Sequence, residues 1–453
     1  MPDLSNIVQI DRLLNAAEIA RFCPLLSRPV VSTIVKAEVE RYRQKVRQQG
    51  SEVSADDLLE SIVAALAYQG TQRIQPVVNA TGILVHTNFG RSPLPRQVWD
   101  EAAEVTCSYS NLEMNLVNGK RGNRMGNLPL LLQAYFGGES SLLVNNNAAG
   151  MHLLLRAFAA GKEVVVSRGE QVQIGGGFRI PEILAESGAI LRDVGTTNIT
   201  TVDDYLAAVN EHTAIVLVVH QSNYYIEGFT KRVDTKVLAS RLPPHVLLVV
   251  DQGSGNVHAG ISGEPPISTY LRAGAHLVCF STDKMVGGPQ GGVIVGQKDL
   301  IARLAKHPMM RAFRPGKETY ALLERLLLHR LNQDEVSKDR VAEILAKPLA
   351  WHEDRAKRIA KVAPKQLEVV PAKYLIGGGT TPRAQYDTWA VKLDDVFSAS
   401  VWLKRLREHS PPIMGVTQQD QVLLYPVALF DDEFDVVMDA LKEVYQSVKA
   451  ARK

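Results

Sequence analysis

The sequence predicts an α/β protein whose central domain holds a mostly parallel β-sheet. The chain has 453 residues, 45% of them hydrophobic, so it can bury a large core and divide into domains. Its apolar runs are short and solid, which is typical of strands that are covered on both faces of a sheet. Segments with helical periodicity separate these runs between residues 76 and 340. Together these observations predict a large α/β domain flanked by two smaller ones.

The first domain, residues 1–75, is predicted to be helical. Apolar side chains recur at helical spacing from Ile10 to Ala17 and from Val31 to Tyr42, and a further helix is expected from Ala55 to Tyr68. The middle segment is rich in lysine and arginine, partly balanced by glutamate. Such a pattern indicates a solvated helix face more often than a nucleic-acid contact, and charge alone leaves both open.

Seven strands are predicted in the large domain, residues 76–340. They cover residues 141–144, 163–167, 189–194, 213–220, 245–251, 277–280 and 292–295. Five of them are followed by polar clusters, at 145–147, 168–170, 220–223, 251–253 and 283–284. Because ligands bind at the carboxyl ends of strands in such sheets, the clusters predict a site on one edge.

The last domain, residues 341–453, is predicted to be a small α+β unit. It has helical periodicity over 351–362 and from Asp432 onward. Strands are expected near 388–392 and 421–425, with a glycine turn at 377–379.

Lys284 is the leading candidate for a catalytic residue. It follows an apolar run and precedes the glycine-rich segment 287–292. A lysine at the end of a buried strand can lose its proton and form a Schiff base with a carbonyl cofactor. The same pattern also occurs in surface β-turns, so the segment alone leaves both readings open.

Asp251 strengthens the case for Lys284. It ends an apolar strand 33 residues earlier (284 − 251), which leaves room for one crossover helix. Pyridoxal 5'-phosphate needs a lysine for its aldehyde and a carboxylate that keeps its ring nitrogen protonated. The alternative role for Asp251 is to cap the turn at Gly253. The presence of both Asp251 and Lys284 favours cofactor binding over the capping role.

A phosphate site is predicted at Asn146, Asn147 and Ala148, where a strand meets a helix expected from Met151 to Ala160. Backbone N–H groups at a helix N-terminus bind phosphate, although a plain asparagine cap is the alternative. The Ser281 hydroxyl could add a donor. His220, at another strand end, is a candidate cofactor neighbour.

Several arginines lie outside the periodic apolar positions and suit the bidentate capture of anions. They are Arg91, Arg121, Arg124, Arg311 and Arg314. Any single one is most often a solvated surface residue. Their placement in expected loops favours anion binding.

Composition narrows the class of protein. The net charge of +3 makes the chain close to neutral, so contact with nucleic acid requires a local patch. The three cysteines are far apart and odd in number, which indicates a reducing compartment and predicts a cytoplasmic protein without disulfides. No histidine has metal-site spacing, and no apolar run is long enough to span a membrane, so neither a metal nor a membrane partner is expected.

Long, ordered motifs over nearly the whole chain resemble those of bacterial selenocysteine synthases, the L-seryl-tRNA(Sec) selenium transferases. The motifs are Ile10-Asp11-Arg12-Leu13-Leu14, Asn79-Ala80-Thr81-Gly82, His86-Thr87-Asn88, Val144-Asn145-Asn146-Asn147-Ala148-Ala149, Ser167-Arg168-Gly169-Glu170, Ile174-Gly175-Gly176, Phe178-Arg179-Ile180-Pro181, Val194-Gly195-Thr196-Thr197-Asn198, Ser222-Asn223-Tyr224, and Asp283-Lys284 with Gly287-Gly288-Pro289-Gln290.

The resemblance implies a pyridoxal-phosphate enzyme of fold type I that converts seryl-tRNA(Sec) to selenocysteinyl-tRNA(Sec). It implies that Lys284 holds the cofactor and moves protons, that Asp251 faces the pyridine nitrogen, and that Asp283 sits beside the reacting centre. Selenophosphate, the selenium donor, would be bound by the family's basic residues, here Arg91, Arg311 and Arg314. The N-terminal helices would grip the tRNA, and the chain would form a homo-oligomer, at least a dimer and in this family a decamer.

Three positions depart from the family pattern. Gln173 replaces a glutamate, Gln252 a leucine, and Pro426 lies where an arginine is usual. The departures leave open a related lyase or β-eliminase acting on a small amino acid or an amino sugar phosphate. A catalytically silent tRNA-binding protein is the alternative of another class. The N-terminal helices weigh against the lyase, and the Asp251–Lys284 pair weighs against the silent scaffold.

Overall fold

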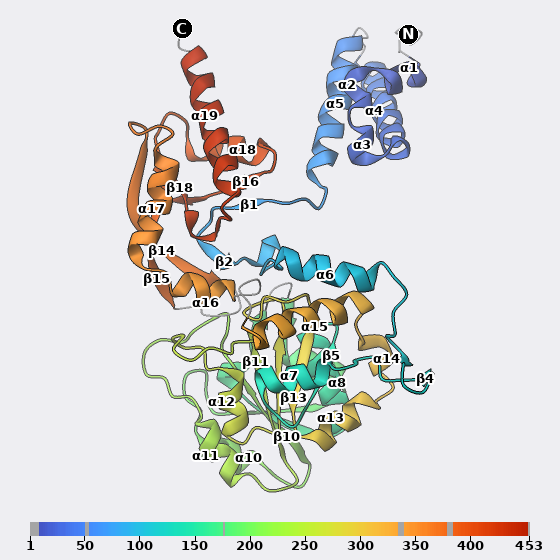
Figure 1. The fold of residues 1–453 in the computed structure, drawn as a ribbon, viewed down its shortest axis with the longest axis vertical. Helices are drawn as coiled ribbons and strands as arrows, with labels where there is room; N and C mark the ends of the chain where they lie inside the picture. The colour runs from blue at the N-terminus through green and yellow to red at the C-terminus, as the bar shows by residue number, and fades with distance from the viewer. Residues whose placement is uncertain (1–8, 50–53, 175–176, 334–338, 378–383, 452–453) are drawn as a thin grey trace. The chain divides into compact units, whose positions relative to one another are not determined.

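The computed structural model describes residues 9–49, 54–174, 177–333, 339–377 and 384–451 (Figure 1). The chain divides into two compact units, Met1–Pro76 and Val77–Lys453. Parts of two features expected from the sequence, the glycine turn at 377–379 and the motif at 174–176, lie outside the described residues.

The N-terminal unit is helical, as predicted. Its helices are α1 (Ile10–Asn15), α2 (Ala17–Ala20), α3 (Cys23–Leu26), α4 (Arg28–Gln49) and α5 (Ala55–Thr71). The two long helices bury their apolar stripes against each other, including Val35 on α4 and Ile62 on α5. Ser54 caps α5 through a hydrogen bond from the backbone N–H of Asp57.

A seven-stranded sheet forms the centre of the second unit, in the order β5-β13-β12-β11-β10-β6-β9. The strands are β5 (Ser140–Val144), β6 (Glu163–Ser167), β9 (Ile190–Val194), β10 (Thr213–Val219), β11 (Leu247–Gly253), β12 (Leu277–Ser281) and β13 (Gly292–Gly296). All seven strands expected from the apolar runs are present. Only β13 runs against its neighbours. The prediction of a mostly parallel sheet is therefore confirmed.

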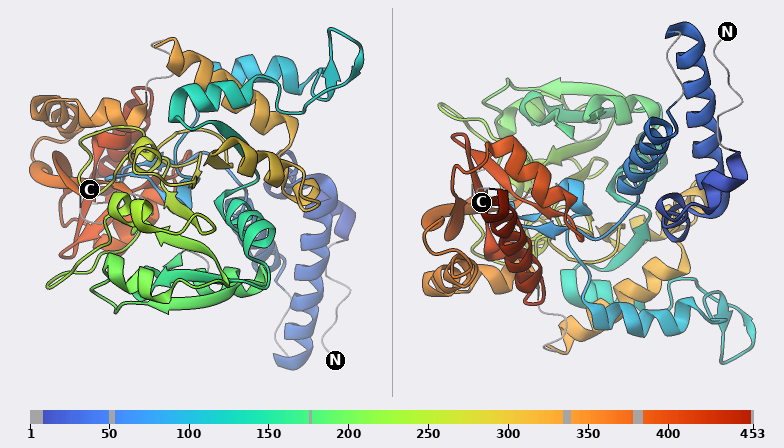
Figure 2. Two further views of the ribbon diagram at one scale, coloured as in Figure 1. Left: turned by 90° about the horizontal axis from the view of Figure 1, so that it is seen from below. Right: turned by 90° about the horizontal axis from the view of Figure 1, so that it is seen from above.

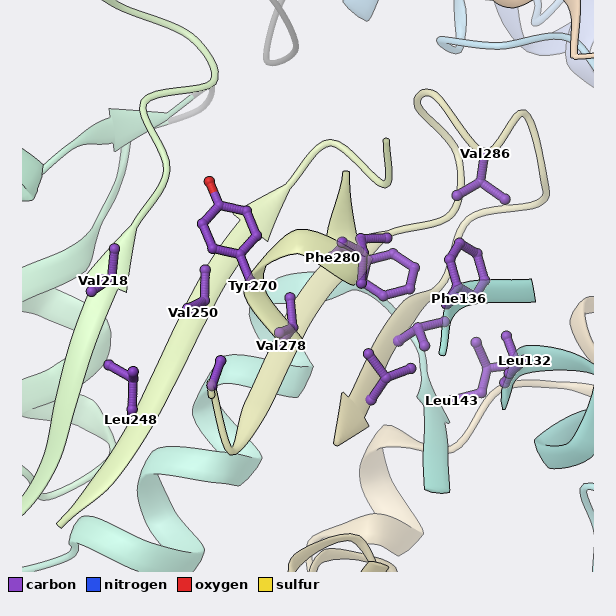
Figure 3. Packing of buried hydrophobic residues seen from close by; sticks show 14 of the residues in the cluster. Leu132, Phe136, Leu143, Val218, Leu248, Val250, Tyr270, Val278, Phe280 and Val286 are labelled. Atoms are coloured by element: carbon purple, nitrogen blue, oxygen red, sulfur yellow. The ribbon is translucent and has the colours of Figure 1, made fainter. Parts of the chain in front are cut away.

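Helices cover both faces of this sheet (Figures 1 and 2). One face packs against α6 (Arg96–Thr106), α7 (Leu128–Phe136), α10 (Val202–Ala208), α11 (Thr235–Arg241), α12 (Ile267–Arg272) and α15 (Lys317–Leu331). The other packs against α8 (Asn147–Ala159), α9 (Ile180–Glu186) and α13 (Lys298–Ala305). In Figure 3, Val218, Val250 and Val278 lie on the first face, together with Phe136 of α7. Burial on both sides explains why these strands are apolar throughout.

The sheet brings the polar clusters to one edge. β5, β12, β11, β10 and β6 run in the same direction, so the segments that follow them all leave the sheet at its carboxyl edge. Asp251 on β11 pairs with Val219 on one side and Cys279 on the other. The clusters expected at this edge are therefore neighbours in space.

A second sheet, in the order β17-β18-β15-β14-β2, lies in the C-terminal part of this unit. Its strands are β2 (Ile83–Val85), β14 (Leu367–Gly377), β15 (Gln385–Leu393), β17 (Val416–Gln418) and β18 (Gln421–Leu424). Also in this part are α16 (Arg340–Leu345), α17 (Leu349–Ala360), α18 (Ala399–Glu408) and α19 (Glu433–Ala451). Nothing in the sequence pattern indicated that β2 joins this sheet, or that β1 (Val78–Asn79) pairs with β16 (Ile413–Met414).

Within the described residues, no helix is both long enough and apolar enough to cross a lipid bilayer.

Candidate active site

Lys284 lies in a tight turn that follows β12. The turn is closed by hydrogen bonds from the N–H of Thr282 to the Gly291 carbonyl at 2.9 Å and from the N–H of Gly288 to the Thr282 carbonyl at 2.8 Å. Gly291 is required here because a Cβ at this position would lie 2.8 Å from the Thr282 hydroxyl. The chain at Lys284 is therefore fixed by backbone contacts.

The Lys284 side chain is buried, with 7% of the residue exposed. Burial lowers the pKa of its ammonium group, and the positive charge of Arg91 acts in the same direction. The nearby carboxylates of Asp251, Asp283 and Glu264 partly oppose that shift in pKa. A lysine of this kind is more readily neutral than an exposed one, as nucleophilic or basic chemistry requires.

Asp251 is buried at the carboxyl end of β11. Its Oδ1 accepts a hydrogen bond of 2.8 Å from Nδ2 of Asn147. Burial raises the pKa of the Asp251 carboxyl, while the Asn147 bond and the charge of Lys284 lower it. The structure thus brings the predicted carboxylate, the predicted lysine and the first residue of α8 together.

The N-terminus of α8 lies at the same edge. Asn146 caps the helix by accepting a bond of 2.9 Å from the N–H of Ala149, while Asn147 and Ala148 form its first turn. Gly292 packs so closely that a Cβ on it would lie 2.2 Å from the Asn146 carbonyl oxygen. The helix starts four residues earlier than the sequence predicted, because the asparagine run contains the cap itself.

A pyridoxal phosphate fits these residues. The amine of Lys284 suits its aldehyde, the buried Asp251 suits its ring nitrogen, and the α8 N-terminus suits its phosphate. Oδ1 of Asn147 is buried and has no hydrogen-bond partner among the described residues, so it is available to accept a hydrogen bond from a polar ligand. Ser281 is buried just before this turn, whereas the Thr282 hydroxyl already donates to the Pro289 carbonyl.

Arg91 reaches the lysine turn from a separate loop. Its Nη1 lies 2.7 Å from both carboxylate oxygens of Asp283. Arg91 has a positive φ of 67°, and its N–H donates to the His86 carbonyl at 2.9 Å. A surface pocket here is lined by Thr87, Gly90, Arg91, Ser92, Leu94, Asp283, Gly288, Pro289 and Gln290. Two predicted site residues, Arg91 and Asp283, therefore contact each other, and Asp283 directly precedes Lys284.

Arg311 and Arg314 lie elsewhere. Arg314 is 3.7 Å from Glu113, and Arg311 is exposed with no ion pair among the described residues. Neither lines the pocket at Arg91. Within one chain, the structure does not bring the three predicted donor-binding arginines together.

His220 borders Asp251 through its backbone, whose N–H donates to the Asp251 carbonyl at 2.9 Å. Its ring belongs to a buried polar network: Nε2 is 2.8 Å from Glu264, and Nδ1 is 3.2 Å from the Tyr270 hydroxyl. Both ring nitrogens thus have protein partners. Glu264 was not singled out in the sequence, because it lies in a loop whose pattern carries no signal for a buried carboxylate.

Each of the three residues that depart from the family pattern makes hydrogen bonds to nearby residues. Gln252 donates to Glu264 at 2.8 Å within the buried network. Gln173 accepts a bond of 2.8 Å from Nε of Arg179 on an exposed hairpin. Pro426 begins a short helical turn, and its carbonyl accepts from Arg355 at 3.2 Å. None of these contacts involves Lys284 or Asp251.

No group of three or more histidine, cysteine, aspartate or glutamate side chains in the described part of the chain is arranged to hold a metal ion.

The sheet, its helices and the lysine at its carboxyl edge define the class of fold type I enzymes, whose cofactor is pyridoxal phosphate. A solved structure of D-glucosaminate-6-phosphate ammonia-lyase has this fold, with a TM-score of 0.60 and 20% identity over 84% of this chain and 98% of that one. At that identity the likeness shows the fold alone.

The particular family follows from closer relatives. Residues 77–429 match the family model described as L-seryl-tRNA selenium transferase, and the chain belongs to that family. It is 37% identical to the L-seryl-tRNA(Sec) selenium transferase of Geobacter metallireducens, over 97% of this chain and 99% of the relative. It is 42% identical to the protein of that name from Solidesulfovibrio magneticus, over 82% of each.

Proposed function

We propose that this protein converts seryl-tRNA(Sec) to selenocysteinyl-tRNA(Sec), with pyridoxal phosphate as cofactor and selenophosphate as selenium donor. The observation that carries the proposal is the burial of Lys284 beside Asp251 at the carboxyl edge of the sheet, in a chain of this family. The family membership favours this function over a small-molecule lyase, and the lysine–aspartate pair disfavours a silent scaffold.

Different residues at the carboxyl edge of the sheet would bind different parts of the cofactor. Asp251, positioned by Asn147, would face the ring nitrogen, and the first turn of α8 would hold the phosphate. The bound cofactor supplies an electron sink that makes loss of the serine α-proton and hydroxyl feasible.

Lys284 would move the protons. Its amine is buried and its pKa is lowered, so it can accept the α-proton of the seryl group and later return one. Arg91 holds Asp283 next to it, and the pocket they line would admit the substrate. Removal of water around these groups strengthens their electrostatic effect on the reacting atoms.

The partners are part of the same proposal. The N-terminal domain, residues 1–75, would bind the tRNA, and the chain would act as a homo-oligomer in the cytoplasm. The helical unit has its own apolar core, which supports a separate tRNA-binding domain, and the free cysteines support a cytoplasmic protein.

The direct test is a transfer assay with purified protein, pyridoxal phosphate, seryl-tRNA(Sec) and selenophosphate. Formation of selenocysteinyl-tRNA(Sec) by the wild type, and not by Lys284→Ala, is the expected result. Failure to bind seryl-tRNA(Sec) at any salt concentration would refute the proposal. Release of ammonia from a small amino acid without any tRNA product would instead support the lyase.

A further inference from the structure

Glu264 lies at the centre of a buried polar network near the carboxyl ends of β10 and β11. Its side chain is fully buried, in the loop between β11 and α12. One carboxylate oxygen lies 2.8 Å from Nε2 of His220. The other accepts hydrogen bonds from Nε2 of Gln252 at 2.8 Å and from the Ser254 hydroxyl. Burying a carboxylate is costly unless polar partners surround it, so these three contacts hold Glu264 in one position.

Gln252 connects Glu264 to the strand that carries Asp251. β11 pairs with β12 through Asp251 and then through Gly253, and the register shifts between them, so Gln252 forms a β-bulge. A bulge redirects the side chains beside it, and here the bulged side chain donates to Glu264. The leucine that is usual at this position in the family could not donate this bond. Glu264 therefore supports the irregular end of β11, next to Asp251.

Ser254 connects Glu264 to the turn that carries Lys284. The Ser254 hydroxyl donates to Glu264. Its carbonyl accepts a hydrogen bond of 3.0 Å from the N–H of Met285, the residue that follows Lys284. A single residue thus joins the buried carboxylate to the backbone beside the lysine.

The loop between these contacts has little freedom. The N–H of Gly255 donates to Oε1 of Gln252 at 2.7 Å, and a Cβ on Gly255 would lie 2.6 Å from the Ser281 carbonyl oxygen. Nδ2 of Asn256 donates to the backbone carbonyl of Glu264 at 2.6 Å. The loop is therefore fixed both to Glu264 and to the end of β12, so a change at Glu264 is passed on to both strand ends.

Glu264 also acts on Lys284 through its charge. Burial and the positive charge of Arg91 lower the pKa of the Lys284 amine, and Glu264 opposes that shift in pKa together with Asp251 and Asp283. Exchange of the Glu264 carboxylate for an amide would therefore change the electrostatic environment of the amine as well as the contacts of the loop.

We propose that Glu264 is a positioning residue of the cofactor site. Through its two donors on β11 and the following loop, it holds Asp251 and Lys284 at the separation that pyridoxal phosphate requires. The inference rests on the proposed function, because the cofactor is part of that proposal. A carboxylate that served the fold alone would affect stability and leave the bound cofactor unchanged.

Glu264→Gln tests both effects in the full-length protein, because glutamine keeps the size of the side chain but lacks the charge and one acceptor. The dissociation constant of pyridoxal phosphate should rise about tenfold, since a charged hydrogen-bond acceptor is lost from the network. The pH at which the visible absorbance of the bound cofactor changes should fall by about half a unit or more, because a charge that favours a protonated Lys284 nitrogen is removed. Both quantities are measured by titration in a spectrophotometer.

Gln252→Leu separates position from charge, because it removes one donor and leaves the carboxylate in place. Cofactor binding should weaken about three- to tenfold, while the pH midpoint of the absorbance change should stay that of the wild type. Glu101→Gln is the matched control, because Glu101 forms a similar pair with a histidine, 2.9 Å from Nε2 of His329, outside the network. It should match the wild type in both measurements.

Wild-type values of both quantities in Glu264→Gln, shown to be folded by circular dichroism, would overturn the proposal. A lower melting temperature of the cofactor-free variant with unchanged cofactor binding would also overturn it, because Glu264 would then serve the fold alone. If Glu264→Gln does not fold, Gln252→Leu decides, and an unchanged dissociation constant in that variant would refute the positioning role. The expected cofactor changes in a protein that forms no selenocysteinyl-tRNA(Sec) would uphold the role of Glu264 and refute the proposed function. The two failures are therefore distinguishable.

Discussion

Asp283 and Glu113 are both carboxylates bound by arginine, but in opposite proportions. Asp283 receives one guanidinium, from Arg91, and lies next to the Lys284 amine. With Asp251 and Glu264, that region holds three carboxylates against two cationic side chains, Arg91 and Lys284. Glu113 is shared by three guanidinium groups. Carboxylates outnumber cations around Lys284, and burial still lowers the pKa of its amine, whereas arginines outnumber the carboxylate at Glu113.

Lys284→Ala should have the largest effect at the site that contains Asp283. Loss of the amine removes both the attachment of the cofactor and the group that moves protons, so transfer should fall by about 10³-fold or more. The visible absorbance of the bound cofactor should change at the same time. A variant that keeps both the spectrum and the activity would show that Lys284 has no catalytic role.

Asp283→Asn tests how the neighbouring carboxylates affect the pKa of Lys284. The Asp283 charge raises the pKa of Lys284 and the Arg91 charge lowers it, so removing this carboxylate should lower that pKa further, although Asp251 and Glu264 still raise it. Because the neutral amine is the active form, the acid limb of the pH–rate profile should move to lower pH, with activity reduced about 10- to 100-fold. Asp100→Asn, at an exposed pair, is the control and should leave the profile in place.

Glu170 extends the comparison to a buried carboxylate that forms no ion pair with arginine among the described contacts. Burial raises its pKa to about 7, although Val219 N–H donates to it at 2.8 Å. The folded protein thus holds a proton that the unfolded chain releases near its ordinary pKa of 4.5. The contribution of Glu170 to stability is therefore complete below about pH 4.5 and is lost as the pH rises through about 7.

Glu170→Gln should remove that pH dependence. The wild type should lose about 3 kcal/mol relative to the variant between pH 4.5 and pH 8, measured by denaturant unfolding across this range. Glu182→Gln changes an exposed side chain, so its free energy of unfolding should depend on pH in the same way as that of the wild type. If the stability of Glu170→Gln also follows that of the wild type across this pH range, Glu170 is already ionised in the folded protein.

Arg121→Ala should have the smallest effect on stability. Its side chain is the most exposed of the arginines at Glu113, and such pairs contribute less than about 1 kcal/mol. A shift in the urea midpoint that corresponds to more than this would indicate that Arg121 anchors the hairpin at 114–121, and that the excess charge there is structural.

The sheet could be predicted from the sequence because its strands are buried on both faces. A run such as Val246–Val250 has no helical period and no polar interruption, which leaves few alternatives. The position of Lys284 beside Asp251 followed from the same logic, since carboxyl ends of parallel strands share an edge. The sequence did not predict that α8 begins before Met151, because an asparagine can be a helix cap, part of the first turn or part of a loop.

The remaining site contacts depend on distant loops. Glu113 and Arg314 are about 200 positions apart (314 − 113 = 201), and their ion pair leaves no periodic trace. The burial of Glu264 against His220 likewise comes from loops that close over the sheet. Charged residues in loops are usually solvated, so only the folded structure shows which ones are brought together.

The strand β2 has a consequence for the order of events during synthesis. Ile83 pairs with Leu375, and Val78 of β1 pairs with Ile413. Both strands are therefore made within the first hundred residues, long before their partners exist. The two strands remain unpaired until nearly the whole polypeptide has emerged from the ribosome. We expect the early chain to depend on chaperones, and pausing near residues 375–413 to alter the yield of folded protein.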